Sequence, residues 1–308
     1  MNSRRRFEWK FGTTRVLLGE RTVIGGVLHI RPDIDPDSAF AAAAGMEEAG
    51  AGLICLGADE FAPGSKRLSE AEELRRLVGV MRRLRDKLTV PLIVDTDRSA
   101  VALRAFELGA AAIFDRTAAT FDPQLPRLIA QHNAGLIVGH MRGLPESWPK
   151  LGPMKDAAAV VTAELEASLH RARLAGVSAQ SLVVDPGLGA GKRREQNLEI
   201  LAQLARLHRL EIPIACGAAD LMPAAALTAA VLEGAHILWT SDVKLTREAA
   251  DVADGLLAAL PASVDNAESS VFRADRPEPA QPERRIESGL RPSNRPKPPD
   301  RWRPPKAH

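Results

Sequence analysis

Residues 181–192 of the chain read Ser-Leu-Val-Val-Asp-Pro-Gly-Leu-Gly-Ala-Gly-Lys. The apolar run from Leu182 to Val184 predicts a buried strand that ends at a carboxylate, Asp185. Pro186 has no N–H to donate and ends the strand, and the glycines after it allow a sharp turn into a helix expected from about residue 193. A carboxylate at a strand end, beside exposed amides and a helix N-terminus, favours a ligand with N–H donors or a negative charge.

Two common glycine motifs do not match this stretch. A phosphate-binding P-loop requires a glycine five residues before Gly191, where the chain has Pro186. The dinucleotide-binding motif requires G-x-G-x-x-G, whereas the chain has G-x-G-x-G. The stretch therefore predicts neither of these nucleotide sites.

Outward from this stretch, the chain repeats a unit of helix, glycine and strand. A glycine just beyond a helix C-terminus supplies the left-handed residue on which helices commonly end, and strands this apolar are typical of a sheet buried on both faces. Strands are expected at residues 23–30, 52–57, 91–95, 111–115, 135–140, 181–185, 212–217 and 236–240. Helices are expected at residues 36–49, 69–87, 98–108, 122–132, 156–175, 193–208, 221–233 and 244–260.

Eight such units in about 240 residues predict an α/β fold, the (β/α)8 TIM barrel, with a doubly wound open sheet as the alternative. Residues 1–22 are expected to form an N-terminal arm with a β-hairpin, and residues 23–260 the barrel. Proline and arginine dominate residues 261–308, so this tail is predicted to be disordered. The tail either has no role or docks weakly on an acidic partner or a domain that recognises polyproline.

Composition narrows the class of protein. With 308 residues, 45% of them hydrophobic, the chain can bury one large core, and a net charge of +2 indicates no nucleic-acid partner. Two cysteines are too few for a disulfide scaffold. No apolar run approaches the ~18 residues of a membrane span, and no hydrophobic signal core follows the N-terminus. The sequence therefore predicts a cytoplasmic enzyme with no membrane partner.

The expected strand ends supply the candidate site residues, because the chemistry of a TIM barrel gathers at the C-terminal ends of its strands. These ends carry His29, Cys55, Asp95, Asp115, His140, Asp185, Gly217 and Thr240. Buried strands rarely end in charge for packing reasons alone, so the carboxylates point to a site. Structural alternatives remain open: Asp95 caps the following helix, Asp115 pairs with Arg116, or His140 is a satisfied buried histidine.

The chain resembles the dihydropteroate synthases, folate-pathway enzymes that join a pterin to p-aminobenzoate. The resemblance covers nearly all of residues 7–260, and its motifs are D-P-G-x-G-x-G-K at 185–192, G-G-V-L-H-I-R-P-D at 25–33, I-V-D-T at 93–96, H-M-R-G at 140–143 and N-L-E at 197–199. It implies that Asp95 and Asp185 bind the pterin ring and that Met141 and Gly217 line its pocket. Further candidates for the same face are Asp115, His140, Lys192 and Arg142.

Departures from the family pattern cluster where the family binds metal and diphosphate. The family's magnesium-binding asparagine is His29 here, so Mg²⁺ is doubtful and neither a metal nor another cofactor is predicted. Phe61 and Ala62 replace a loop threonine and arginine, Phe114 a pterin-contacting asparagine, Leu221 a lysine, and Trp239 and Ser241 the arginine and histidine that hold the diphosphate. Arg31, Arg142 and Lys192 are the cations expected to remain on that face.

Removing one group that stabilises developing charge commonly slows an enzyme ~100- to 1,000-fold. The sequence therefore predicts a dihydropteroate synthase-like pterin-binding protein with a degenerate diphosphate site and no assigned catalytic residue. One alternative is an active dihydropteroate synthase, a transferase that condenses 6-hydroxymethyl-dihydropterin diphosphate with p-aminobenzoate. The other is a non-catalytic scaffold protein. The expected partners are a small-molecule pterin and a second copy of the chain in a homodimer.

Overall fold

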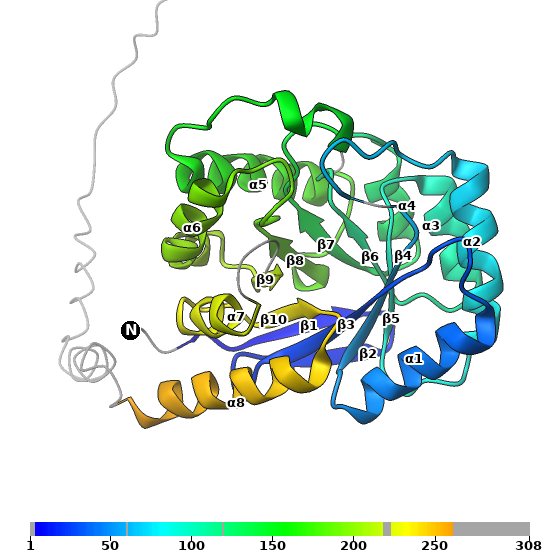
Figure 1. Cartoon of the computed structure of the whole chain (residues 1–308), viewed down its shortest axis with the longest axis horizontal. Helices are drawn as coiled ribbons and strands as arrows, with labels where there is room; N and C mark the ends of the chain where they lie inside the picture. Colours follow the sequence, from blue (N-terminus) through cyan, green and yellow to red (C-terminus); the bar gives the residue numbers. More distant parts are fainter. Residues whose placement is uncertain (1–3, 60, 119, 218–222, 261–308) are drawn as a thin grey trace, which may run out of the picture. The chain divides into compact units, whose positions relative to one another are not determined.

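The computed structural model describes residues 4–59, 61–118, 120–217 and 223–260. Eight parallel strands lie in the order β8-β7-β6-β5-β4-β3-β10-β9. A parallel bridge between Val184 and Ile214 joins the two outermost strands, so the sheet closes on itself with the helices outside it (Figure 1). The predicted (β/α)8 TIM barrel is confirmed, and the open sheet is not formed.

The observed elements follow the expected ones closely. The barrel strands are β3 (Val23–His29), β4 (Leu53–Gly57), β5 (Leu92–Asp95), β6 (Ala112–Asp115), β7 (Gly135–Gly139), β8 (Leu182–Asp185), β9 (Ala215–Gly217) and β10 (Ile237–Thr240). The α-helices are α1 (Pro36–Glu48), α2 (Glu70–Leu84), α3 (Ser99–Glu107), α4 (Leu125–Gln131), α5 (Ala157–Leu174), α6 (Arg194–Ala202), α7 (Pro223–Leu232) and α8 (Val243–Ala259). Short 3₁₀ helices occur at η1 (Pro145–Lys150), η2 (Ala179–Ser181) and η3 (Leu204–Leu210).

Two boundaries differ from the expectation. Strand β9 begins later than expected because Pro213 has no N–H, although its carbonyl still accepts from Val184 N at 2.9 Å. The helix expected to reach residue 208 ends at Ala202, and the 3₁₀ helix η3 follows it. The expected tail at residues 261–308 lies outside the described residues.

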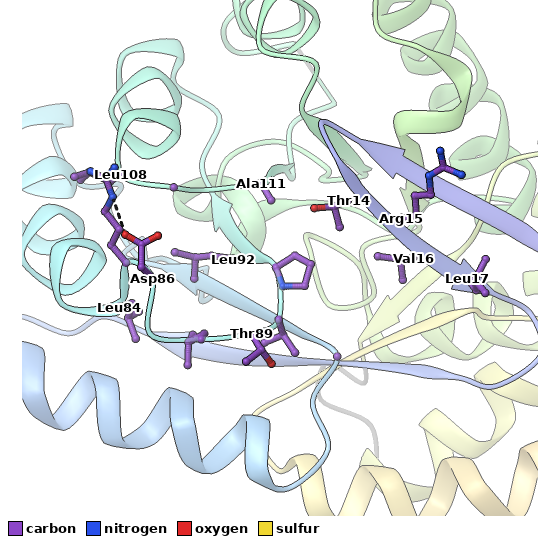
Figure 2. Close-up of a pocket in the computed structure, with 16 residues that line it drawn as sticks. Thr14, Arg15, Val16, Leu17, Leu84, Asp86, Thr89, Leu92, Leu108 and Ala111 are labelled. Atoms are coloured by element: carbon purple, nitrogen blue, oxygen red, sulfur yellow. Dashed lines mark ion pairs between the residues drawn. The ribbon is translucent and has the colours of Figure 1, made fainter.

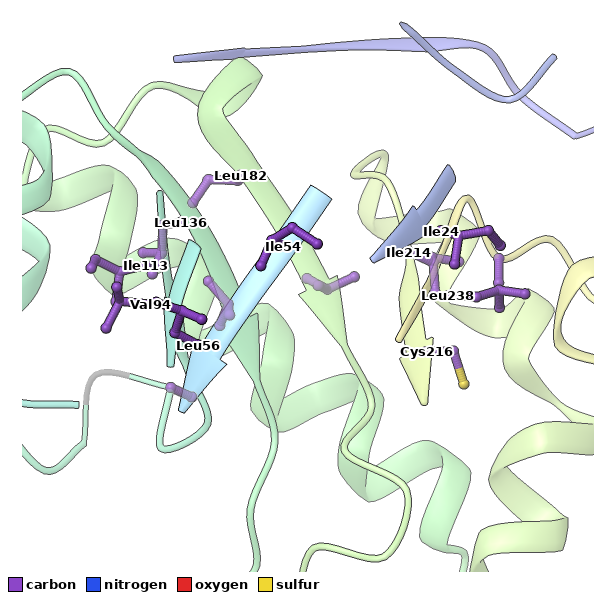
Figure 3. Close-up of a cluster of buried hydrophobic side chains, with 14 of the residues drawn as sticks. Ile24, Ile54, Leu56, Val94, Ile113, Leu136, Leu182, Ile214, Cys216 and Leu238 are labelled. Carbon is purple, nitrogen blue, oxygen red and sulfur yellow. The ribbon is translucent and has the colours of Figure 1, made fainter. Parts of the chain in front are cut away.

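Side chains that alternate along the strands build two apolar layers. One set, which includes Ile54, Val94 and Ile113, packs outward beneath the helices (Figure 3). A second set packs in the barrel interior and comprises, among others, Leu53, Cys55, Ile93, Phe114, Ile137, Val183, Ile237 and Trp239. The interior is therefore filled with side chains, as in other TIM barrels, and the free space lies at its ends.

The N-terminal hairpin covers one of these ends. Strands β1 (Phe7–Phe11) and β2 (Thr14–Leu18) pair antiparallel, as predicted. Trp9 and Phe11 are buried in the interior layer, and the Trp9 indole N–H donates to the Ser181 carbonyl at 2.9 Å, just before β8. A side chain at Gly135, the first residue of β7, would lie 2.9 Å from Trp9. The hairpin thus closes the N-terminal end of the barrel and leaves the C-terminal end for the site.

A cavity of about 600 Å³ lies at that N-terminal end, between β2 and the segments that lead into β4, β5 and β6 (Figure 2). Its charged lining residues are Arg15, Arg85 and Asp86, and Arg85 Nε lies 3.5 Å from Asp86 Oδ2. None of the carboxylates at the strand ends lines it. In the described part of the chain, no helix has the length and apolarity needed to cross a membrane.

Candidate functional site

A cavity of about 630 Å³ opens at the C-terminal ends of the barrel strands. It brings together six of the candidate residues named from the sequence: His29, Asp95, Asp185, Lys192, Gly217 and Thr240. Asp95 ends β5 and Asp185 ends β8, and both side chains are almost fully buried. We call this space the mouth cavity.

The glycine turn after β8 shapes one wall of the mouth cavity. Asp185 Oδ1 accepts a hydrogen bond from Gly187 N at 2.7 Å, which folds the turn back onto its own carboxylate. Gly187 has φ of 62°, and a Cβ atom there would lie 1.9 Å from the His140 carbonyl oxygen. The glycine therefore permits close approach to the β7 loop as well as to a ligand. Burial raises the pKa of Asp185 to about 6, although the Gly187 amide opposes this shift.

Lys192 holds the same turn together. Its Nζ donates to the carbonyls of Gly187 at 2.7 Å, His140 at 3.1 Å and Ala190 at 3.2 Å. These three contacts use the full donor capacity of an ammonium group. Burial lowers the pKa of Lys192 to about 7, against the attraction of Asp185. Lys192 is therefore a brace for the turn, and its donors are already committed to protein groups.

Asp95 has one satisfied oxygen and one unsatisfied oxygen. Oδ2 accepts from Arg116 Nε at 2.6 Å, whereas Oδ1 is buried and has no hydrogen-bond partner among the described residues. Burial raises the pKa of Asp95, and the Arg116 guanidinium opposes this shift. The alternative that Asp95 caps α3 is not what the structure shows, because Asp122 Oδ2 accepts from Ser99 N at 2.8 Å in the first turn of that helix.

Arg116 is a site residue that the sequence does not predict, because its pattern indicates only a pairing with the adjacent Asp115. The guanidinium instead turns toward Asp95, and its Cζ lies 4.7 Å from the ring centre of Phe114 and 4.9 Å from that of Phe61. Asp115 Oδ1 accepts from the amide and hydroxyl of Thr117 at 2.8 and 2.7 Å. Asp115 is buried and does not line the mouth cavity.

The floor of the mouth cavity is aromatic. Phe114 and Trp239 stack with ring centres 5.6 Å apart, and the indole lies against Gly25, where a Cβ atom would be 2.1 Å from the ring. The Trp239 indole is close enough to Asp185 to lower the pKa of that carboxyl slightly, although Nε1 makes no hydrogen bond of normal geometry. Hence both Asp95 Oδ1 and Trp239 Nε1 are polar atoms that a ligand in the cavity could satisfy.

Four predicted residues lie elsewhere. His140 and Met141 line a separate cavity of about 240 Å³, and His140 Nε2 lies 2.8 Å from Glu164 Oε2. Burial lowers the pKa of His140 to about 3, which favours the interpretation of a neutral, buried histidine. Arg142 Nη1 donates to the Gly152 carbonyl, and Asp115 is held by Thr117 as described above. The structure therefore does not gather Met141, Arg142, His140 and Asp115 into the mouth cavity.

The positions that depart from the family pattern do line it, with one exception. Phe61, Ala62, Trp239 and Ser241 contribute to its wall together with His29, whereas Leu221 lies outside the described residues. Arg31, an expected remaining cation, is exposed and pairs with Asp33 at 3.6 Å. Of the described lining residues, Arg116 and Lys192 are the arginine and the lysine.

The donors around the cavity do not suit magnesium. Mg²⁺ prefers hard oxygen ligands in octahedral geometry, and His29 offers an imidazole nitrogen in place of an amide oxygen. Asp95 already gives Oδ2 to Arg116. Within the described ranges there is no group of three or more His, Cys, Asp or Glu side chains that could hold a metal ion. We therefore assign no role to a metal.

Comparison with known proteins gives a consistent result. The model of the family described as pterin binding enzyme matches residues 31–221. The dihydropteroate synthase of Synechocystis is 34% identical over 214 residues, which cover 67% of this chain and 74% of that protein. The enzyme of Clostridium beijerinckii is 31% identical over 216 residues, or 68% of this chain and 78% of that protein.

Solved structures agree with the sequence comparisons. The Yersinia pestis dihydropteroate synthase in complex with a sulfonamide drug superposes with a TM-score of 0.77 at 27% identity and covers 82% of this chain and 100% of its own. The Burkholderia cenocepacia enzyme, complexed with 7,8-dihydropteroate, gives a TM-score of 0.73 at 29% identity, covering 82% of this chain and 97% of its own.

Proposed function

Because the chain belongs to the dihydropteroate synthase family of pterin-binding enzymes, we propose that it binds a pterin in the mouth cavity and has lost the family condensation. The observation that carries the proposal is the pair of buried carboxylates, Asp95 and Asp185, on one cavity. Trp239 and Ser241, which line the same cavity, are uncharged where the resemblance places anion-binding residues. Pterin metabolism in the cytoplasm is the setting that this proposal implies.

The carboxylate pair suits the donor edge of a pterin. The pyrimidine ring of a pterin carries an N–H and an amino group, and carboxylate oxygens accept from both. Asp95 Oδ1 has no protein partner among the described residues, and an unsatisfied buried acceptor is costly. A ligand N–H at that oxygen would remove the cost. The stacked rings of Phe114 and Trp239 provide a flat apolar floor that suits a fused ring system.

The same cavity is poorly equipped for a diphosphate. Lys192 spends its donors on three backbone carbonyls. At Trp239 and Ser241 the resemblance places the arginine and histidine that hold the diphosphate in the family. Losing two contacts worth ~3 kcal/mol each would slow the departure of diphosphate by about four orders of magnitude. We therefore propose that a pterin diphosphate binds the mouth cavity with about the same affinity as the pterin itself.

We also propose that the chain forms a homodimer through α8. One face of this helix exposes Leu245, Val252 and Leu256, which are 45%, 63% and 51% accessible. Their spacing places them along a single stripe, and a stripe of this kind is typical of a helix that packs against a partner.

The pterin site is tested by calorimetry with the variant Asp185→Asn. Replacing an acceptor with an amide presents donors to donors, so we expect pterin binding to weaken by roughly 2 to 4 kcal/mol. Asp86→Asn is the matched control, because Asp86 is exposed and lies at the other end of the barrel. Unchanged affinity in Asp185→Asn would remove this carboxylate from the site.

Loss of the condensation is tested by growth. A bacterial strain that lacks its own synthase, and expresses this chain, is expected to need the downstream folate products. Robust growth without them would support the alternative of an active dihydropteroate synthase.

A further inference from the structure

Arg116 already occupies part of the space in which a ligand would meet Asp95. Its Nε donates to Asp95 Oδ2 at 2.6 Å, and its guanidinium lies over the rings of Phe114 and Phe61. The side chain therefore sits where a flat ligand would find both an aromatic surface and a carboxylate. The second carboxylate oxygen, Oδ1, is left without a partner among the described residues.

A guanidinium group and the pyrimidine edge of a pterin offer similar donors. Each carries coplanar N–H groups around a carbon bonded to nitrogens, and each has flat faces that stack on aromatic rings. Both groups present the same kind of donor to a carboxylate. They differ in the number of hydrogen bonds that they give it. Arg116 gives Asp95 one hydrogen bond, whereas a pterin edge placed squarely on a carboxylate gives two parallel ones.

A second aspartate on the same cavity, Asp59, pairs with an arginine in a different way. Asp59 Oδ1 accepts from Leu68 N at 2.7 Å, and Asp59 Oδ2 lies 3.3 Å from Arg67 Nε. Both oxygens of Asp59 thus have partners, and the pair pins the loop after β4. Asp95 differs because its pairing with Arg116 leaves one oxygen unsatisfied.

We propose that Arg116 is a specificity-determining residue that competes with the guanidine-like edge of the ligand for Asp95. This inference rests on pterin binding at the mouth cavity. On ligand entry, one internal hydrogen bond is exchanged for two from the ligand, and the guanidinium moves toward solvent. The Arg116 side chain is 28% exposed, so it has a path to water. A ligand with a single donor on that edge gains nothing from the exchange and is rejected.

Competition between Arg116 and the ligand for Asp95 has a predictable effect on ligand affinity. The apparent affinity of a ligand falls by the fraction of molecules in which its binding group is free. Removing the competitor therefore tightens binding, whereas removing an ordinary binding residue weakens it. The direction of the change separates the two roles.

The test compares calorimetric titrations of the wild-type protein, Arg116→Met and Arg104→Gln with a pterin. Methionine keeps an unbranched stem without N–H donors, and Arg104 is a control on α3 that pairs with Glu107 away from the cavity. The titration is repeated at several pH values, because burial raises the pKa of Asp95 and the variant lacks the Arg116 cation that opposes this shift. We expect Arg116→Met to bind at least about tenfold more tightly and Arg104→Gln to match the wild type.

The outcomes distinguish this inference from the proposed function. If the wild type binds and Arg116→Met binds equally or more weakly, competition is overturned and pterin binding stands. If none of the three proteins binds a pterin, both the competition by Arg116 and the proposed pterin binding are overturned.

A second measurement uses the wild-type protein alone, in case Arg116→Met does not fold. In ¹⁵N-labelled protein, the Nε–H resonance of Arg116 reports the hydrogen bond to Asp95. Saturation with a pterin should move this resonance to the position of a solvent-exposed arginine. An unmoved resonance at saturation would show that Arg116 stays on Asp95, and the inference would fail.

Discussion

Trp239 stacks on Phe114 across the floor of the mouth cavity, with ring centres 5.6 Å apart and planes inclined by 25°. The two residues come from different strands, β10 and β6. Both stand where the resemblance places a polar residue, an arginine and an asparagine. The two changes support each other, because each ring covers an apolar face of the other. A stacked pair suits a planar ligand and disfavours an anion, which would lose its hydration there.

The stacked pair predicts that a single reversion toward the family pattern is harmful. Trp239→Arg removes a large buried ring and places a charge over Phe114, so the free energy of unfolding should fall by about 3 to 5 kcal/mol. Ser241→His, at an exposed position on the rim of the same cavity, should change it by less than ~0.5 kcal/mol. Urea unfolding of both variants measures the difference. A Trp239→Arg protein as stable as the wild type would show that the stack contributes little.

Pterin affinity should depend on the ionisation of Asp185. The pKa of this carboxyl is raised to about 6 by burial, so lowering the pH through 6 protonates it and removes an acceptor. We expect the dissociation constant to rise as pH falls below 6, approaching tenfold per pH unit. Asp185→Asn should lack this dependence. An affinity that is flat from pH 7 to pH 5 in the wild type would contradict an acceptor role for Asp185.

The contribution of Lys192 to the free energy of unfolding should also depend on pH. Here burial lowers the pKa, whereas it raises the pKa of Asp185. Burial lowers its pKa from 10.5 to about 7, so between these values the unfolded chain holds a proton that the folded chain has released. Unfolding free energy then rises with pH, and the destabilising effect of Lys192 is full below pH 7 and lost toward pH 10.5. Lys192→Met should remove this rise.

Lys192→Met should also lower the free energy of unfolding at every pH. Lys192→Met leaves the carbonyls of Gly187, His140 and Ala190 without their donor, which should destabilise the turn by about 1 to 3 kcal/mol. Chemical denaturation at several pH values measures both effects. Parallel stability curves for the wild type and the variant would rule out the lowered pKa.

The proposed dimer is tested at α8. Leu256→Glu places a charge on the exposed stripe and should convert a dimer to a monomer in sedimentation experiments. Leu174→Glu is the control, since Leu174 is 75% accessible at the end of α5. A wild-type protein that sediments as a monomer would remove the dimer, and dissociation by the control alone would place the interface elsewhere.

Much of the architecture could be predicted because local signals agreed with the fold. Each barrel strand is an apolar run that ends at a polar residue or a glycine, so the run itself locates the strand. Asp95 and Asp185 could be placed at one end of the barrel because parallel strands present their C-terminal ends together. Placing these residues at one end requires only that the strands are parallel. It does not require the direction of each side chain.

Residues just beyond the strands were harder to predict. Arg116 follows Asp115 in the sequence, but its side chain turns to Asp95 on the neighbouring strand, and a linear sequence does not reveal that direction. Met141 also follows a strand end and faces a different cavity from the one expected. The bracing role of Lys192 depends on three carbonyls from two loops, and these meet only once the barrel has formed.

The ratio of two dissociation constants shows whether the mouth cavity has lost its diphosphate site. A pterin and its 6-hydroxymethyl-dihydropterin diphosphate counterpart are titrated into the wild-type protein under the same conditions by calorimetry. Because Lys192 is committed to backbone carbonyls, and Trp239 and Ser241 stand where the resemblance places the diphosphate-holding arginine and histidine, we expect both ligands to bind with dissociation constants that agree within about threefold. A diphosphate that binds about 100-fold more tightly, or a pterin that does not bind at all, would contradict it.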